Sequence, residues 1–167
     1  MGDPRLRQQA KPVPLSELAH AAQVAAAMQQ LMSERNGVGI AAPQIGVGLA
    51  LMIIASRPSE RYPDAPNMDP LLLINPTLSW QSESLETLWE GCLSVPGLRG
   101  RVTRPNGVAV DYMDLNGDKH RVELEGFPAR IFLHEYDHLI GKTFLDRVAS
   151  SEDLVTEKVY FEQICTA

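Results

Sequence analysis

The segment His134-Glu135-Tyr136-Asp137-His138 constrains the fold of this chain more than any other feature. Residues four positions apart share one face of an α-helix, so the imidazoles of His134 and His138 can bind one metal ion together. Glu135 then lies beside the ion, where its carboxylate can take a proton from water that the cation has made more acidic. The alternative is a chance match of three residues in a charged helix. We interpret the segment as a metal-binding helix.

A third metal ligand must come from elsewhere in the chain, because a catalytic metal ion usually has three protein ligands. Cys92 is the best candidate, since Gly91 before it permits tight backbone geometry and a cysteine binds metal as the thiolate. Taken alone, such a cysteine is more often a small buried residue, and we interpret Cys165 near the C-terminus in that way. The sequence thus offers one thiolate and two imidazoles.

The stretch Gly37-Val38-Gly39-Ile40-Ala41-Ala42-Pro43-Gln44 is rich in small residues. Its glycines are compatible with an ordinary loop, and it lacks the following helix that a phosphate-binding loop needs. Alternatively, the stretch lets the backbone approach a ligand closely and adds the side-chain amide of Gln44 as a hydrogen-bond donor. The stretch alone does not decide between these readings.

Two helices are predicted, one near the N-terminus and one that contains the metal-binding segment. Ser16 suits the N-cap of a helix that runs to about Asn36, and Gly37 would end it. Pro128 suits the first turn of the second helix, which would run to Gly141. The part that begins at residue 150 is amphipathic and predicts a short surface strand or helix.

Short strands are expected between the two helices. Residues 49–55 and 71–74 have the apolar pattern of buried strands, and the four prolines within residues 57–70 indicate a surface excursion between them. Residues 108–113 and 122–124 alternate on either side of an Asn-Gly turn, which predicts a hairpin with His120 exposed on its return strand. We therefore expect an α+β fold, in which antiparallel strands pack around a central metal-binding helix and one N-terminal helix is added.

The composition limits the functions open to the chain. At 167 residues a single domain, residues 1–167, is expected. A formal net charge of −6 argues against direct nucleic-acid binding, which depends on clustered Lys and Arg. Two cysteines do not make a secreted disulfide scaffold, and neither a signal peptide nor a membrane span is visible. These features predict a cytoplasmic protein that is not bound to a membrane.

The three segments, in this order and at these separations, closely resemble the signature motifs of peptide deformylases. The similarity extends to Asp3-Pro4-Arg5-Leu6 and to residues 96–104 after the cysteine. The resemblance implies a bacterial cytoplasmic enzyme that hydrolyses N-formylmethionyl nascent peptides and releases formate. It implies iron(II) as the metal in cells, in whose place zinc, nickel or cobalt can bind.

The resemblance also assigns roles to particular residues of this sequence. It makes Cys92, His134 and His138 the metal ligands and Glu135 the general base and acid. Gln44 and the backbone N–H of Leu93 would stabilise the oxyanion. The expected pocket for the methionine side chain and the peptide is formed by Val38, Gly39, Leu88, Gly91, Arg99, Phe127 and Ile131, with Arg99 at the mouth.

Three departures from the family pattern stand out. Leu133 occupies the position before His134 where glutamine is customary, so a polar contact to the metal site is expected to be missing. Only two residues precede Asp3, where family members have a short strand, so we expect a truncated start. The acidic C-terminal part does not resemble the basic tail with which some relatives bind ribosomal RNA, although association with the ribosome stays possible.

Two other functions remain open at this point. The first is a zinc metallopeptidase, which has the same helix but usually takes a further histidine or carboxylate downstream as third ligand. Asp146, Glu152 and Asp153 are available for that role. The second is a catalytically silent, metal-stabilised peptide-binding domain, which the Leu133 replacement keeps open.

Overall fold

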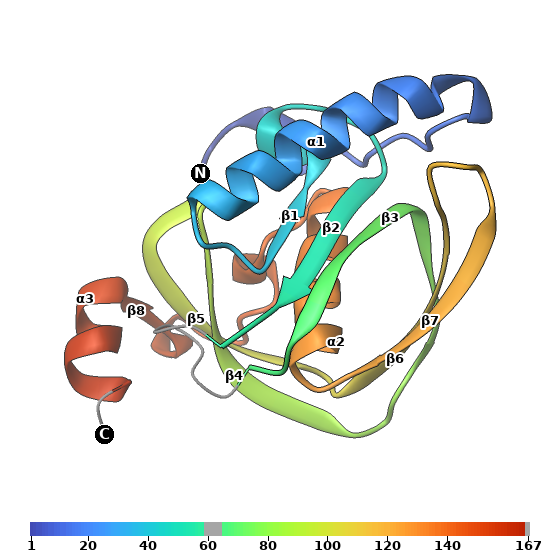
Figure 1. Ribbon diagram of the computed structural model, residues 1–167. Helices are drawn as coiled ribbons and strands as arrows, with labels where there is room; N and C mark the ends of the chain where they lie inside the picture. The colour runs from blue at the N-terminus through green and yellow to red at the C-terminus, as the bar shows by residue number, and fades with distance from the viewer. Residues whose placement is uncertain (59–64, 166–167) are drawn as a thin grey trace.

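The computed structural model describes residues 1–58 and 65–165, and Figure 1 shows its helices and strands. The α+β fold predicted from the sequence is confirmed. Its α-helices are α1 (Leu18–Glu34), α2 (Phe127–Leu139) and α3 (Glu157–Val159). Its strands are β1 (Gly39–Ala41), β2 (Leu51–Ser56), β3 (Met68–Gln81), β4 (Leu85–Cys92), β5 (Val95–Pro105), β6 (Gly107–Met113), β7 (Lys119–Glu125) and β8 (Leu154–Thr156).

The strands form two antiparallel sheets. One has five strands in the order β1-β2-β3-β6-β7, and the other has three in the order β4-β5-β8. In Figure 1, α1 crosses one face of the larger sheet near β1 and β2, and α2 lies on the other side of these strands. No helix among the described residues is long and apolar enough to cross a membrane.

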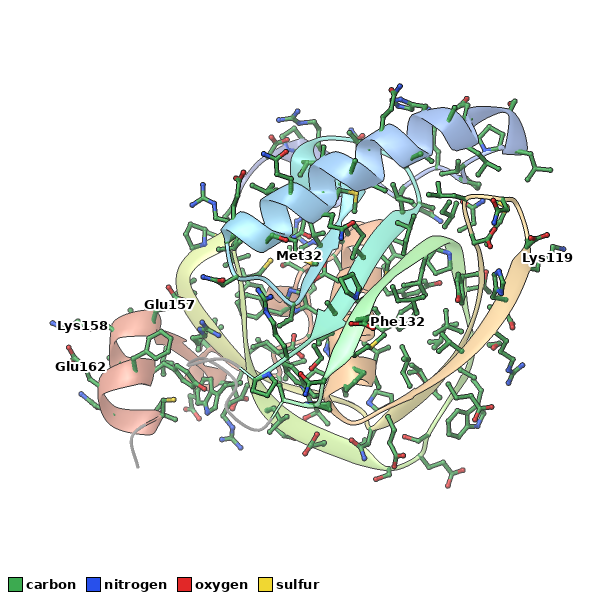
Figure 2. The ribbon with its side chains drawn as sticks, viewed as in Figure 1. Met32, Lys119, Phe132, Glu157, Lys158 and Glu162 are labelled. Carbon is green, nitrogen blue, oxygen red and sulfur yellow. The ribbon has the colours of Figure 1, made fainter. Side chains whose placement is uncertain are left out.

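Strand β2 shows why these layers form. Its side chains alternate between two apolar clusters, because successive residues of a strand point to opposite faces. Met52 and Ile54 pack in the cluster that contains Phe132 of α2, which is labelled in Figure 2. Leu51 and Ile53 pack in the other cluster, against α1. An uninterrupted apolar run is what a strand covered on both faces requires. Each such side chain contributes roughly 1.5–3 kcal/mol when it is fully buried.

Strand β3 is longer than predicted, because the prolines in this region do not end it. Met68 to Pro70, assigned from the sequence to a surface excursion, belong to β3. Pro76 follows Asn75, which has φ 51°, and the pairing register with β6 shifts between Ile74 and Thr77. Proline is tolerated at such a bulge, since no ladder hydrogen bond is lost there. The rest of the predicted excursion includes residues 59–64, which lie outside the described residues.

The helix ends differ in detail from the predicted ones. Ser16 lies in a short 3-10 turn, and Glu17 is the N-cap of α1 without a side-chain cap. Gly37 was expected to end the helix, but Asn36, with φ 49°, takes the left-handed conformation that commonly follows a helix. Asparagine tolerates that conformation better than most residues, and Gly37 N–H still donates to the carbonyl oxygen of Met32 at 2.9 Å. Helix α2 ends at Leu139, two residues before the predicted end.

Two β-hairpins connect neighbouring strands of the sheets, β6–β7 in the larger sheet and β4–β5 in the smaller one. The predicted β6–β7 hairpin is confirmed, with Val110 paired to Val122. The β4–β5 hairpin was not predicted as a pair of strands, because its charged and glycine residues hide the alternation. Its two-residue turn, residues 93 and 94, places Cys92 opposite Val95.

The C-terminal part contains both a strand, β8, and helical turns, as the amphipathic pattern allowed.

Candidate metal centre

Cys92, His134 and His138 meet at the end of β4 and on one face of α2. Their ligand atoms all lie within 4.8 Å of one another, and Sγ of Cys92 is 3.3 Å from Nε2 of His138. Within the described part of the chain this is the group of side chains that can hold a metal ion. One thiolate and two imidazoles leave a position open for water or substrate, as catalytic sites do. The residues present therefore fit the predicted divalent cation.

The thiol of Cys92 is prepared to bind a cation. Burial alone would raise its pKa, but hydrogen bonds and charge interactions with His134 and His138 hold that pKa well below its ordinary value. The deprotonated form is the one that binds metal. The pairing of Cys92 with the two histidines thus favours the thiolate form that a cation needs.

Glu90, a neighbour of Cys92 on β4, orients the first histidine. Its Oε2 lies 2.9 Å from Nδ1 of His134, which leaves Nε2 of that ring for the cation. Burial lowers the pKa of His134, whereas Cys92 and Glu90 raise it, and the net result lies well above the ordinary value. A proton and a cation therefore compete for this imidazole.

Glu90 is itself part of a buried ion-pair network that connects β4, β5 and α2. Its Oε1 accepts from Nε of Arg104 at 2.6 Å and from Nη1 of Arg130 at 2.9 Å. Arg104 also donates to Oδ2 of Asp137 at 2.9 Å, and Arg147 binds the same carboxylate. Buried charges persist only when they are paired in this way. The network was missed from the sequence, because its members lie far apart along the chain and follow no regular spacing.

Burial changes the acidity of Glu135, whose carboxylate interacts with the charges of the ligand group. It is 4% exposed, and this burial raises its pKa to about 7. Its Oε2 has no hydrogen-bond partner among the described residues. A Cβ atom at Gly39 would lie 2.5 Å from its Oε1, so only glycine leaves room for this carboxylate. A carboxyl group with a pKa near neutrality can both take up and release protons.

Gln44 reaches the same centre from the 3-10 turn Ala42–Ile45. Its Oε1 accepts a hydrogen bond from the backbone N–H of Ala41 at 2.8 Å, which fixes the orientation of the amide. Its Nε2 lies 3.5 Å from Sγ of Cys92 and 3.3 Å from Oγ of Ser94. The small-residue stretch therefore brings a side-chain N–H donor to the metal centre.

A pocket of about 530 Å³ opens over this centre. Most of the residues predicted to bind substrate line it, namely Val38, Gly39, Gly91, Phe127 and Ile131. Leu88 and Arg99 do not: Leu88 is half-exposed on β4, and Arg99, at 1% exposure, is buried behind Gly91. Trp89 and Arg35 also line the pocket, although no pattern in the sequence had indicated them.

Leu133 is accommodated as an apolar residue. It is buried in the cluster between α2 and the larger sheet, and its carbonyl oxygen accepts from Arg104 at 3.4 Å. Nδ1 of His138 has no hydrogen-bond partner among the residues described. One of the two imidazoles thus has a carboxylate partner in Glu90, and the other has none in this part of the chain.

Comparison with known proteins agrees with this geometry. A family model described as Polypeptide deformylase matches residues 1–153. Peptide deformylase 2 of Nostoc sp. is 44% identical over 167 residues, which cover 98% of this chain and 92% of that protein. Peptide deformylase 2 of Shewanella oneidensis is 54% identical over 125 residues, 75% of this chain and 69% of its own length.

A solved structure gives the same result in three dimensions. It is the Met-Ala-Ser-bound class I type b peptide deformylase from Acinetobacter baumannii, with a TM-score of 0.87 and 45% identity. The match covers 89% of this chain and 94% of that one. Similarity of this extent, in both sequence and structure, means that the chain belongs to the polypeptide deformylase family.

Proposed function

We propose that Glu135, Gln44 and the backbone N–H of Leu93 carry out the deformylase reaction of this chain. As a member of the family, the chain is a hydrolase that removes the formyl group from the N-terminus of nascent peptides. The observation that carries the assignment of residues is the meeting of Cys92 with two histidines beside a buried carboxylate.

The metal ligands in this proposal are Cys92, His134 and His138. A divalent cation bound to them would act as a Lewis acid that makes water more acidic and polarises the formyl carbonyl group. Imidazole and thiolate suit iron(II), zinc, nickel and cobalt, and we propose iron(II) as the metal in cells.

Glu135 moves the protons of the reaction. Its carboxylate takes a proton from the attacking water, and then gives that proton to the amine nitrogen as the C–N bond of the formyl group breaks. The products are formate and a free N-terminus. A pKa of about 7 suits both steps, because the group must be deprotonated at first and acidic enough afterwards.

Gln44 and Leu93 bind the formyl oxygen as negative charge develops on it. The Leu93 side chain is 62% exposed, so its contribution comes from the backbone at the hairpin turn. The amide of Gln44 is held by Ala41 and needs no reorientation. Preorganised donors of this kind are worth about 2.7–4 kcal/mol of barrier each.

The pocket is proposed to bind the methionine and the peptide that follows it. Val38, Phe127 and Ile131 offer apolar surface for the methionine side chain, and Gly39 and Gly91 offer backbone groups for the peptide. The relative from Acinetobacter baumannii was solved with Met-Ala-Ser bound, which supports a peptide in this position. We place the reaction in the bacterial cytoplasm, where formylated chains emerge from the ribosome.

The decisive experiment is an anaerobic assay of the iron(II)-loaded protein for formate release from formyl-Met-Ala-Ser. Glu135→Gln should keep the metal and lose turnover, whereas Glu125→Gln, an exposed change on β7, should leave both intact. A fully active Glu135→Gln protein would refute the role of this residue. Cleavage of unformylated Met-Ala-Ser would instead indicate a peptidase, and peptide binding without formate release a silent binding domain.

A further inference from the structure

Arg99 on β5 is a fully buried arginine outside the pocket. The residue is 1% exposed, and its Nη2 forms an ion pair with Oε1 of Glu157 at 3.0 Å. Its Nε has no hydrogen-bond partner among the described residues. A guanidinium in such a place must be held by its surroundings, because it would otherwise be more stable in water.

Several groups in contact with Arg99 belong to the C-terminal segment, residues 154–164. Its Cζ lies 5.3 Å from the ring centroid of Tyr160 and 5.4 Å from that of Phe161, both within the range of cation–π attraction. Glu157, labelled in Figure 2, lies on the same segment. Strand β8 joins this segment to β5, with Arg99 paired to Val155.

Arg99 also packs against the backbone of Gly91. A Cβ atom at Gly91 would lie 2.6 Å from both Cζ and Nε of Arg99, closer than such atoms approach one another. Gly91 lines the pocket and directly precedes the ligand Cys92. The guanidinium is therefore wedged between the strand that carries the metal ligand and the C-terminal segment.

We infer that Arg99 is a positioning residue, held in place by the C-terminal segment, which sets the position of Gly91 and through it the thiolate of Cys92. Glu157, Tyr160 and Phe161 keep the guanidinium against β4, and the guanidinium keeps the Gly91 backbone pressed toward the pocket. The inference rests on the proposed function, because it treats Gly91 and Cys92 as parts of the substrate and metal sites. It extends that function to a segment outside residues 1–153, the part matched by the family model.

The test compares Arg99→Gln, Arg99→Lys and Glu157→Gln in the full-length protein with two matched controls. Arg101→Gln changes a half-exposed arginine on the same strand, and Glu152→Gln changes an exposed glutamate just before β8. Each variant is loaded with cobalt(II). The readouts are the cobalt dissociation constant, the thiolate-to-cobalt absorption band, and kcat and KM for formyl-Met-Ala-Ser.

Arg99→Gln should weaken cobalt binding about tenfold, the lower end of the effect of removing a residue that orients a metal ligand. It should also shift the absorption band and raise KM, and Arg99→Lys should restore part of each change. Glu157→Gln should produce a smaller change in the same direction, and both controls should match the unsubstituted protein.

An unchanged cobalt dissociation constant and an unchanged band in folded Arg99→Gln would overturn the inference. If Arg99→Gln does not fold, Glu157→Gln decides, since it keeps the packing around the guanidinium and removes only the ion pair. No change in its cobalt binding would then overturn the inference. Failure of the unsubstituted protein to release formate would refute the proposed function instead, because the cobalt measurements do not depend on turnover.

Discussion

Oε2 of Glu90 lies 2.9 Å from Nδ1 of His134, so a carboxylate at the end of one strand orients a metal ligand on a helix. The same carboxylate accepts hydrogen bonds from Arg104 and Arg130, and all of these side chains are largely buried. The metal centre and the packing of α2 on the β4–β5 hairpin thus depend on one residue.

We predict that Glu90→Gln weakens both metal binding and stability. Loss of a partner that orients a ligand typically lowers metal affinity about 10- to 100-fold. The change also removes the counter-charge of Arg130 and one of the two carboxylates that pair with Arg104, and breaking a buried ion pair costs about 3–5 kcal/mol of unfolding free energy. Metal titration and urea unfolding measure the two effects, with the exposed Glu83→Gln as control. Unchanged metal affinity would show that His134 needs no partner.

Gly39→Ala should inactivate the enzyme without unfolding it. The new Cβ would lie 2.5 Å from Oε1 of Glu135 and 2.9 Å from Cγ2 of Ile131, so the carboxylate must move. Since a general acid–base contributes about 10²- to 10⁴-fold to the rate, kcat should fall by at least about 100-fold. Gly48→Ala is the matched control, because nothing lies within 4 Å of its added Cβ. A Gly39→Ala enzyme with normal kcat would mean that Glu135 need not stay where it is.

Removal of the metal should lower the stability of the folded protein. A ligand that binds only the native state stabilises it by about 2.7 kcal/mol when its concentration is 100 times the dissociation constant. Thermal unfolding with and without a chelator measures this difference. Cys92→Ser should shrink the difference. Cys165→Ser should not, because this thiol lies outside the ligand group and is exposed, not buried as the sequence had suggested. Equal shifts in the two variants would exclude Cys92 as a ligand.

Asp146 should make stability depend on pH in the acid range. Burial raises the pKa of Asp146. The backbone N–H of Thr143 and the guanidinium of Arg7 together lower that pKa by more, so the net pKa is below the ordinary value. A carboxyl group with a lowered folded-state pKa contributes stability above its unfolded-state pKa of about 3.9. That contribution is lost as the pH falls through the lower, folded-state pKa.

Asp146→Asn should therefore be less stable than the unsubstituted protein at pH 7 and should lose less stability on acidification. Urea midpoints measured between neutral pH and the lowest pH at which the protein stays folded test this. Asp118→Asn, on the β6–β7 turn, is the control. A parallel decline in stability for the Asp146→Asn and unsubstituted proteins would show that this carboxylate does not contribute.

Much of the architecture was predictable because it depends on local periodicity. The apolar run of β2, the alternation around the Asn-Gly turn and Pro128 at the start of α2 all have local causes. Strand β3 could not be bounded in this way, because whether a proline such as Pro70 ends a strand depends on whether the neighbouring strand requires an N–H donor at that position. That the chain is one catalytic domain over residues 1–167 stays a prediction.

The sequence by itself determined the pairing of His134 with His138 and the place of Glu135 beside them, because one turn of helix brings those residues together whatever surrounds it. Only the tertiary structure decided that Cys92 completes the group, that Glu90 orients His134, and that Arg99 lies behind Gly91 and not at the pocket mouth. The physical reason is that these contacts join different elements. Their geometry depends on sheet register and on how the C-terminal segment packs, and neither is encoded in the spacing of residues along the chain.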